Sequence, residues 1–290
     1  RKAFHDMVAQ AGIDFDHSPV GILHVYETAK SMAHADRVND LLAKGGLHRR
    51  AVTPAEIQEI EPTLHGDFVG GYYTDSDSTG DIHKYATGLA DYLKRVGVQF
   101  RMGYAVEAVH HMSNGVQIDT VGGTLNADAL VVTAGVGSRD LARQLGDRVN
   151  VYPVKGYSIT VNMRDEVSQA AAPQVSLLDD EAKIVTSRLG ADRFRVAGTA
   201  EFNGENRDIR NDRIVPLVKW VEKFFPDVST EHVTPWAGLR PMMPNMMPRV
   251  GQGLSDRVFY NTGHGHLGWT LSAATAEIIG AKIADRFGAT

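Results

Sequence analysis

The stretch VFYNTGHGHLGWT, residues 258–270, decides how the rest of the chain is interpreted. Residues 258–262 have the composition of a strand, and a helical pattern runs from Trp269 to Phe287. Glycines at 263, 265 and 268 separate them. Glycines between a strand and a helix let backbone N–H groups approach an anion or an electron-rich ring. A tight turn that binds nothing explains the pattern equally well.

Outward from this stretch, the chain shows two kinds of strand pattern. Residues 129–133 form an apolar run, typical of a strand buried between layers of helices. Residues 151–199 alternate as strands without intervening helices, which indicates an antiparallel sheet. The sequence therefore predicts an α/β (α+β) fold of two interleaved domains, with the chain crossing between them several times.

Helix signals recur between these strands. Helices are predicted from Phe4 to Gly12, over 28–44, after a capping box at 53–56, from Asp81 to Gly97, and around 214–221. Further strands are predicted at 98–109 and 116–120, joined by a turn at 113–115.

Composition excludes several classes of function. The chain has 290 residues, a formal net charge of -5 and no cysteine. Nucleic-acid binding requires clustered positive charge, so nucleic acid is not expected as a partner. Disulfides, thiolate nucleophiles and cysteine-ligated metals are ruled out. The most apolar run, 129–137, is far shorter than the roughly 20 residues of a membrane-spanning helix, so no membrane-spanning segment is expected.

Several segments together resemble one family. Residues 261–270, NTGHGHLGWT, resemble the C-terminal flavin loop of the small subunit of bacterial FAD-dependent D-amino acid dehydrogenases, relatives of D-amino acid oxidase and glycine oxidase. Residues 236–244, WAGLRPMMP, residues 151–158, VYPVKGYS, and residues 79–81, TGD, are similar to the same family. The likeness runs from the first helix through Ile283 in the family's order.

The resemblance implies FAD as cofactor and assigns residues to it. Those expected near the flavin ring are Gly238, Gly263, His264, Gly265, His266, Leu267, Gly268, Trp269 and Thr270. Those expected at the adenosine half are Val106, Ala134 and Gly135.

Two residues are the candidate catalytic residues. Arg240 falls where the related oxidases hold the substrate carboxylate, and a guanidinium fork suits that task because it forms two parallel hydrogen bonds. A surface or interdomain salt bridge is its alternative. His266 is expected beside the flavin, with a structural histidine as the alternative. The related oxidases also supply a tyrosine, but residues 181–185 contain none, and Tyr157 is the candidate substitute.

The dinucleotide fingerprint expected of such a fold is absent from the sequence. Residues 135–140, GVGSRD, imitate it, but Asp140 occupies the third glycine position, so we reject that interpretation. The Rossmann-like domain is thus predicted to lack its first βαβ unit, and the chain, which starts at Arg1, to be a fragment or processed product. We expect such a polypeptide alone to retain little FAD.

The predicted division follows from the same likeness. Residues 1–78 and 151–235 are assigned to the substrate domain, and residues 79–150 and 236–290 to the FAD-binding domain. No metal is expected, because the pairs His264/His266 and His110/His111 have no acidic or cysteine ligand at suitable spacing.

The resemblance implies oxidative deamination of a D-amino acid, with hydride passing from Cα to flavin N5 and the imine hydrolysing to a 2-oxo acid. Electrons are expected to pass to a quinone or an electron-transfer protein, from a cytoplasmic enzyme that is peripheral to the inner membrane. A glycine-, sarcosine- or hydroxyproline-oxidising flavoenzyme is the first alternative. An inactive remnant that does not bind FAD is the second.

Overall fold

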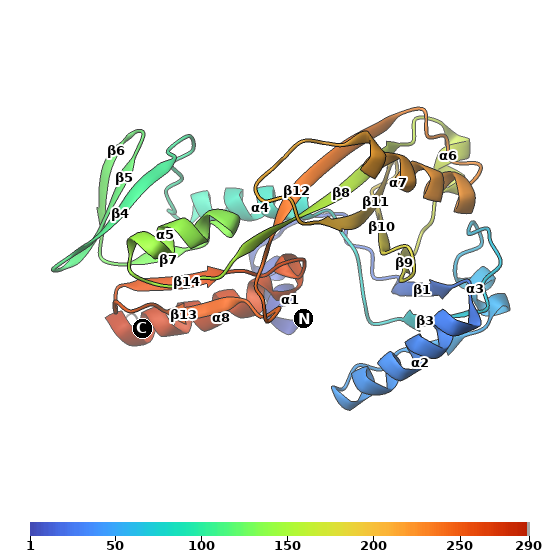
Figure 1. The fold of residues 1–290 in the computed structure, drawn as a ribbon, viewed down its shortest axis with the longest axis horizontal. Coiled ribbons are helices and arrows are strands. Elements are labelled where there is room, and N and C mark those ends of the chain that lie inside the picture. The colour runs from blue at the N-terminus through green and yellow to red at the C-terminus, as the bar shows by residue number, and fades with distance from the viewer. Residues whose placement is uncertain (289–290) are drawn as a thin grey trace.

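The computed structural model describes residues 1–288, which form three sheets (Figure 1). The largest sheet has eight strands, in the spatial order β12, β8, β11, β10, β9, β1, β3, β2. These are β12 (Val233–Met242), β8 (Tyr152–Asn162), β11 (Arg193–Glu201), β10 (Ile184–Leu189), β9 (Ser176–Asp179), β1 (Ile22–Tyr26), β3 (Gly70–Thr74) and β2 (Arg50–Val52). Within this sheet, β1 and β9 form the one parallel pair among residues 1–288. The predicted antiparallel sheet is confirmed, and the chain enters it from both halves of the sequence.

One face of this sheet carries the main core. The core-facing side chains of β8 are Tyr157, Ile159 and Val161, which pack with Leu217 and Phe224 of the amphipathic helix α7 (Asn211–Phe224). Helices α3 (Pro54–Ile60) and α6 (Glu166–Ala171) lie beside the same core. The opposite face is covered at its β1–β3 end by α2 (Ala29–Lys44). Towards β8 and β12 this opposite face is open to the second part of the molecule.

The second part combines a small sheet with helices. Strands β7 (Leu130–Val132) and β14 (Val258–Thr262) are parallel, and β13 (Arg249–Gln252) adds an antiparallel edge. Around them lie α1 (Lys2–Ala11), α4 (Ile82–Arg95), the short 3-10 helix η1 (Gly135–Gly137), α5 (Ser138–Gln144) and α8 (Gly268–Phe287). A separate antiparallel sheet contains β4 (Val106–Met112), β5 (Gly115–Thr120) and β6 (Gly123–Ala127). The predicted α/β class is confirmed.

Local signals placed most helix boundaries correctly. Thr53 and Glu56 form the predicted capping box at the start of α3. Asp81 caps α4 by accepting hydrogen bonds from the first-turn amides. Gly12 ends α1 in the left-handed conformation. Each signal is a short-range hydrogen bond or a backbone preference, so it can be recognised without knowing the tertiary fold.

Two predictions of secondary structure were wrong. Residues 98–105 do not form the first part of a strand, because no strand among residues 1–288 pairs with them, and the side chains at 98, 100, 102 and 104 are exposed. A strand exists only as part of a hydrogen-bonded ladder, which a sequence pattern cannot supply. Helix α6 interrupts the segment 151–199, which was expected to hold no helix, because Asp165 caps the amide of Ser168.

Residues 1–15 pack away from the large sheet. Phe4, Phe15 and Tyr85 form an aromatic cluster with Trp269 at the start of α8. Strand β12 belongs to the large sheet along its whole length. These contacts do not test the domain boundaries at 78, 150 and 235, which stay a prediction.

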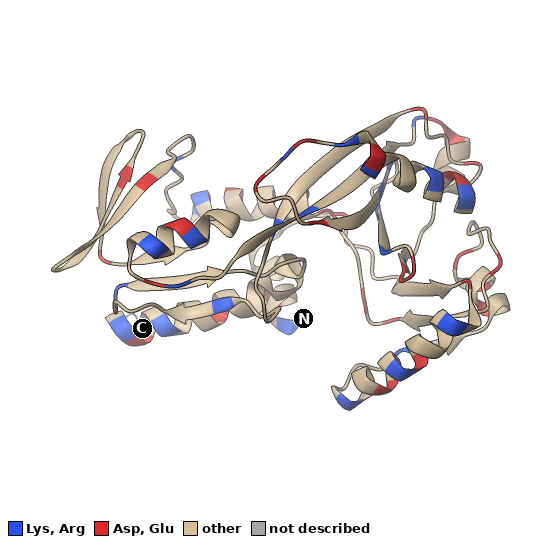
Figure 2. Ribbon diagram, in the orientation of Figure 1, with Lys and Arg blue, Asp and Glu red and all other residues tan. Residues whose placement is uncertain are grey.

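Charged side chains are mixed in sign over the molecule. Figure 2 shows basic and acidic residues interspersed along α2, α5 and α8. In the described part of the chain, none of the helices is long and apolar enough to cross a membrane.

Candidate functional site

The turn between β14 and α8 is built around glycines with positive φ. Gly263 and Gly265 have φ angles of 78° and 58°. A Cβ added to Gly265 would lie 2.6 Å from Sδ of Met242, and one added to Gly263 would lie 2.6 Å from Cγ of Met243. The amide of Gly265 donates a 3.0 Å hydrogen bond to the carbonyl of Pro241. The turn is thereby held directly against the end of β12, next to Arg240.

The first turn of α8 is free to receive a ligand. Leu267 is its N-cap residue and provides no side-chain cap, so the amides of the first turn have no capping side chain. The N-terminus of a helix carries about half a positive charge. Nearby, Nε1 of Trp269 and Oδ1 of Asn261 are buried without a hydrogen-bond partner among the described residues. Glycines and uncapped first-turn amides suit a flat, electron-rich ring.

The carboxyl ends of β7 and β14 bring a second group of predicted residues to the same place. Thr262 ends β14, and its hydroxyl bonds Ser138 at 2.8 Å and the carbonyl of Gly135 at 3.4 Å. Ala134 and Gly135 follow β7 directly, and Gly135 has a φ of 56°. Ligands in open α/β sheets bind at the carboxyl ends of parallel strands. Val106 opens β4 in the separate sheet, and Val109 of the same strand packs in one hydrophobic cluster with Val132 of β7.

The two histidines of the turn differ in environment. Nε2 of His264 lies 3.1 Å from the hydroxyl of Thr275 in α8, and burial lowers the pKa of His264, which favours the neutral ring. His264 therefore braces the turn against its own helix. His266 is exposed. Groups of three or more side chains suited to a metal ion are not found among residues 1–288.

Arg240 points along the open face of the large sheet. Its Nη1 donates a 2.9 Å hydrogen bond to the carbonyl of Thr199, which sits at a bulge of β11 with a φ of 69°. Its guanidinium lies over Gly156, where any Cβ would come within 2.2 Å of it. Burial, and then the charge of Arg195, lower the pKa of Arg240. No carboxylate lies within 4.0 Å of the guanidinium in the described chain, so it can accept one from a ligand.

Two further residues complete this surface. The indole of Trp236 lies over Gly238, which is the cross-strand partner of Gly156. The guanidinium carbon of Arg195 lies 5.3 Å from the centre of the Trp236 ring. We call the side chains of Arg195, Trp236 and Arg240 the arginine face. Sequence reasoning missed Arg195, although the strand alternation of residues 193–197 places it on the face opposite the buried Phe194 and Val196.

Tyr157 does not belong to this surface. Its side chain is buried on the opposite face, and its hydroxyl donates a 3.1 Å hydrogen bond to Glu201. Successive residues of a strand point to opposite faces, and Gly156 and Ser158 are the residues of β8 that share the face of Arg240. The prediction that Tyr157 takes the place of the tyrosine of the related oxidases was therefore wrong. Val185, from the segment that lacks a tyrosine, does share the face of Arg240 and is 45% exposed.

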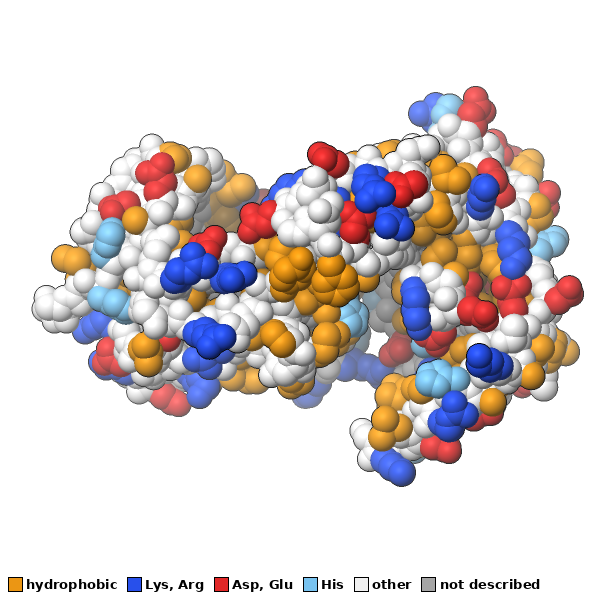
Figure 3. Space-filling view, in the orientation of Figure 1, with side chains coloured by type: hydrophobic (Ala, Val, Ile, Leu, Met, Phe, Trp, Pro, Cys, Tyr) orange, Lys and Arg blue, Asp and Glu red, His pale blue; other side chains and the backbone are white. Residues whose placement is uncertain are grey.

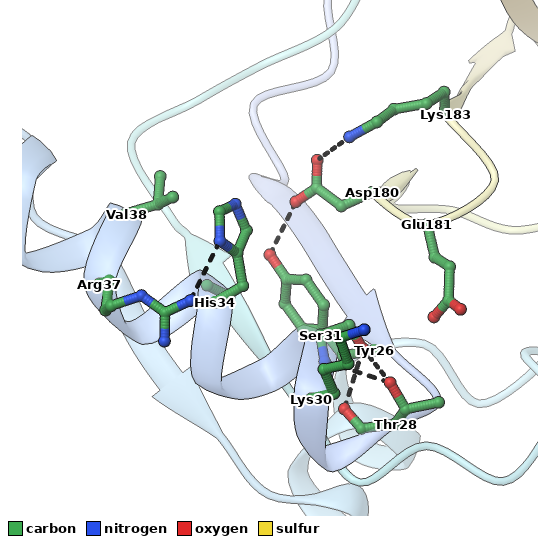
Figure 4. A pocket seen from close by; sticks show the side chains of 11 residues that line it. Tyr26, Thr28, Lys30, Ser31, His34, Arg37, Val38, Asp180, Glu181 and Lys183 are labelled. Atoms are coloured by element: carbon green, nitrogen blue, oxygen red, sulfur yellow. Dashed lines mark hydrogen bonds and ion pairs between the residues drawn. The ribbon is translucent and has the colours of Figure 1, made fainter.

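A separate cavity of about 400 Å³ lies where α2 meets the turn after β9 (Figure 4). The hydroxyl of Tyr26 donates a 2.8 Å hydrogen bond to Asp180, and Lys183 approaches the same carboxylate. A hydrogen bond with His24 is the main cause that lowers the pKa of Asp180 to about 2. None of the predicted site residues lines this cavity.

The surface near the end of β12 is rich in apolar side chains. Figure 3 shows hydrophobic groups gathered in the middle of the view, over the ends of β8 and β12. Met246 and Met247, in the loop after β12, are 55% and 63% exposed.

Comparison with known proteins defines the class. The family model described as FAD dependent oxidoreductase matches residues 1–282, and the chain belongs to this family. FAD is therefore its cofactor, and the free first turn of α8 and the glycine turn fit the flavin. The chain is 58% identical to D-amino acid dehydrogenase 3 of Mesorhizobium japonicum, over 98% of this chain and 70% of that protein. It is 39% identical to D-amino acid dehydrogenase of Paramagnetospirillum magneticum, over 99% of this chain and 68% of that protein.

Solved structures confirm the fold. Glycine oxidase from Geobacillus kaustophilus superposes with a TM-score of 0.87 at 22% identity, over 97% of this chain and 75% of that chain. L-α-glycerophosphate oxidase from Mycoplasma pneumoniae, solved with FAD bound, gives a TM-score of 0.82 at 14% identity, over 97% and 78% of the two chains.

Proposed function

We propose that this FAD-dependent oxidoreductase oxidises D-amino acids by removing hydride from Cα. The observation that carries the proposal is Arg240, a partly buried guanidinium without an acidic partner among the described residues, which lies beside the glycine turn. The names of the two relatives supply the class of substrate. The solved structures support the fold that brings Arg240 next to the glycine turn.

Arg240 holds the substrate carboxylate through two parallel hydrogen bonds, which fixes the direction of the Cα–H bond. FAD, when bound, supplies the acceptor of the hydride at N5. The first-turn amides of α8 would hold the ring and would stabilise negative charge on it. The substrate loses hydride from Cα and a proton from its amino group, and the resulting imine takes up water to give a 2-oxo acid and ammonia.

The remaining predicted roles belong to the same proposal. Ala134, Gly135 and Val106 would hold the adenosine half, and Gly238 provides the space that the Trp236 indole occupies. His266, exposed on the turn, lines the rim beside the flavin. Electrons leave to a quinone or an electron-transfer protein, which places the enzyme in the cytoplasm against the inner membrane.

Stereoselective flavin reduction tests the proposal. The enzyme, supplied with excess FAD, is mixed without oxygen with D-alanine, D-glutamate, L-alanine, glycine or sarcosine, and flavin absorbance is followed. We expect bleaching by D-alanine and none by L-alanine. Reduction by glycine or sarcosine alone would establish the alternative enzyme, and no reduction by any amino acid would refute amino-acid oxidation.

A further inference from the structure

A second arginine lies within reach of the proposed substrate. Arg195 extends from β11 on the face that carries Arg240, and its guanidinium stacks near the indole of Trp236. That indole covers Gly238, and the Arg240 guanidinium covers Gly156, the cross-strand partner of Gly238. The two guanidinium groups therefore lie on one face of the sheet, on strands that β8 separates, and the charge of Arg195 acts on Arg240. Because they extend from different strands, each is placed to bind its own anion.

Asp81, whose negative charge acts on Arg195, is already paired with another arginine. Nη1 of Arg193 lies 2.8 Å from Oδ2 of Asp81. Neither guanidinium of the arginine face has a carboxylate within 4.0 Å in residues 1–288. Burial lowers the pKa of Arg195, as it does that of Arg240. Two desolvated like charges side by side are unfavourable unless negative charge joins them.

The surface beside the two groups is largely apolar. In the row of cross-strand neighbours that starts at Trp236, β8 contributes Ser158, β11 contributes Ala197 and β10 contributes Val185. The hydroxyl of Ser158 is buried without a hydrogen-bond partner among the described residues, whereas Ala197 and Val185 offer no hydrogen-bonding groups and suit methylene groups. A ligand that matches this surface therefore has two carboxylates joined by a short aliphatic chain.

We infer that Arg195 binds a carboxylate on the side chain of the substrate while Arg240 binds the α-carboxylate, so that the enzyme selects acidic D-amino acids. This inference rests on the proposed function for the identity of the reaction. It assigns Arg195 as a residue that determines specificity. An uncharged side chain of the same length leaves Arg195 desolvated and without a directly bound carboxylate, so such a substrate binds less well.

Paired substrates test the assignment. D-Glutamate and D-glutamine have the same length and differ in the charge of the side chain, and the ratio of their kcat/KM values is measured for the FAD-loaded enzyme. We expect the wild type to prefer D-glutamate and Arg195→Gln to lower the ratio by about 30-fold or more. Lys219→Gln is the matched control, because it removes one positive charge from an exposed position on α7, which covers the other face. It should keep the wild-type ratio.

Binding of glutarate and butyrate gives a readout that does not depend on turnover. We expect glutarate to bind more tightly than butyrate, and Arg195→Gln to remove most of that difference. Wild-type preference for D-glutamine, or equal loss of both substrates in Arg195→Gln, overturns the assignment. Oxidation of D-alanine with no glutarate preference overturns this inference alone. A preference for glutarate without oxidation of any D-amino acid would support the binding of two carboxylates by Arg195 and Arg240 and would refute the proposed function.

Discussion

Replacing Gly156 with alanine disturbs the carboxylate site without removing any of its polar groups. The added Cβ would lie 2.1 Å from Nη1 and 2.2 Å from Cζ of Arg240, whereas real Cβ contacts essentially never fall below 3.0 Å. The guanidinium must therefore move by about 1 Å or more, and the bond to the Thr199 carbonyl is lost or lengthened. A displacement of this size costs about 100-fold in rate when it misaligns a reacting bond.

The assay compares a D-amino acid with the amine that lacks its carboxylate. We expect Gly156→Ala to lower kcat/KM for the acid by about 10- to 100-fold and to reduce the preference for acid over amine, with the flavin still bound. Gly280→Ala serves as the control, because a Cβ there meets no atom within 4 Å. Near-normal kcat/KM and an unchanged preference in Gly156→Ala would show that the Arg240 fork does not hold the carboxylate.

Three further predictions concern the same elements. With FAD supplied in excess, Arg240→Ala should bind FAD like the wild type but lose about 2–5 kcal/mol of transition-state binding in kcat/KM, and Arg240→Lys should recover only part of this loss. A kcat/KM of Arg240→Ala equal to that of the wild type would contradict the role of Arg240. Gly265→Ala, which strains a φ of 58° and crowds Met242, should lower the ratio of FAD to protein, whereas Gly280→Ala should not. Burial raises the pKa of Glu201, but hydrogen bonds from Lys155, Asn203 and Tyr157 outweigh it and lower the value to about 2. The ionised carboxylate of Glu201 therefore adds stability at any pH above its ordinary pKa, and this stability is lost as the pH falls from that value towards 2. The Tm of the wild type should fall over this pH range, and the Tm of Glu201→Gln should fall less steeply.

The sequence predicted the parts of the site that depend on neighbours in the chain. The glycine turn at 263–268 was recognisable because strand, glycines and helix follow one another within a few residues. The large sheet was recognisable from the alternation of 151–199. Arg240 was found through its resemblance to a known segment, and the structure then showed which face of β12 it occupies.

Features that depend on pairing between distant strands could not be predicted. Arg195 approaches Trp236 only because β8 lies between β11 and β12 in one particular register. The carbonyl of Thr199 reaches Arg240 because a bulge interrupts β11, which nothing in the local sequence marks. The strand expected at 98–105 failed for the same reason, since its apolar pattern has no partner among residues 1–288. The prediction for Tyr157 was wrong because the strand register places its side chain on the other face of the sheet.

The central claim is that Arg240 and the glycine turn hold a carboxylate and the flavin against each other. A crystal structure of the FAD-loaded enzyme with benzoate, a carboxylate that cannot be oxidised at Cα, tests it directly. We predict that both benzoate oxygens bond the guanidinium of Arg240, with the aromatic ring between the flavin and the arginine face and the flavin against the first turn of α8. Benzoate bound away from Arg240, or a flavin that does not contact residues 263–270, would contradict the account.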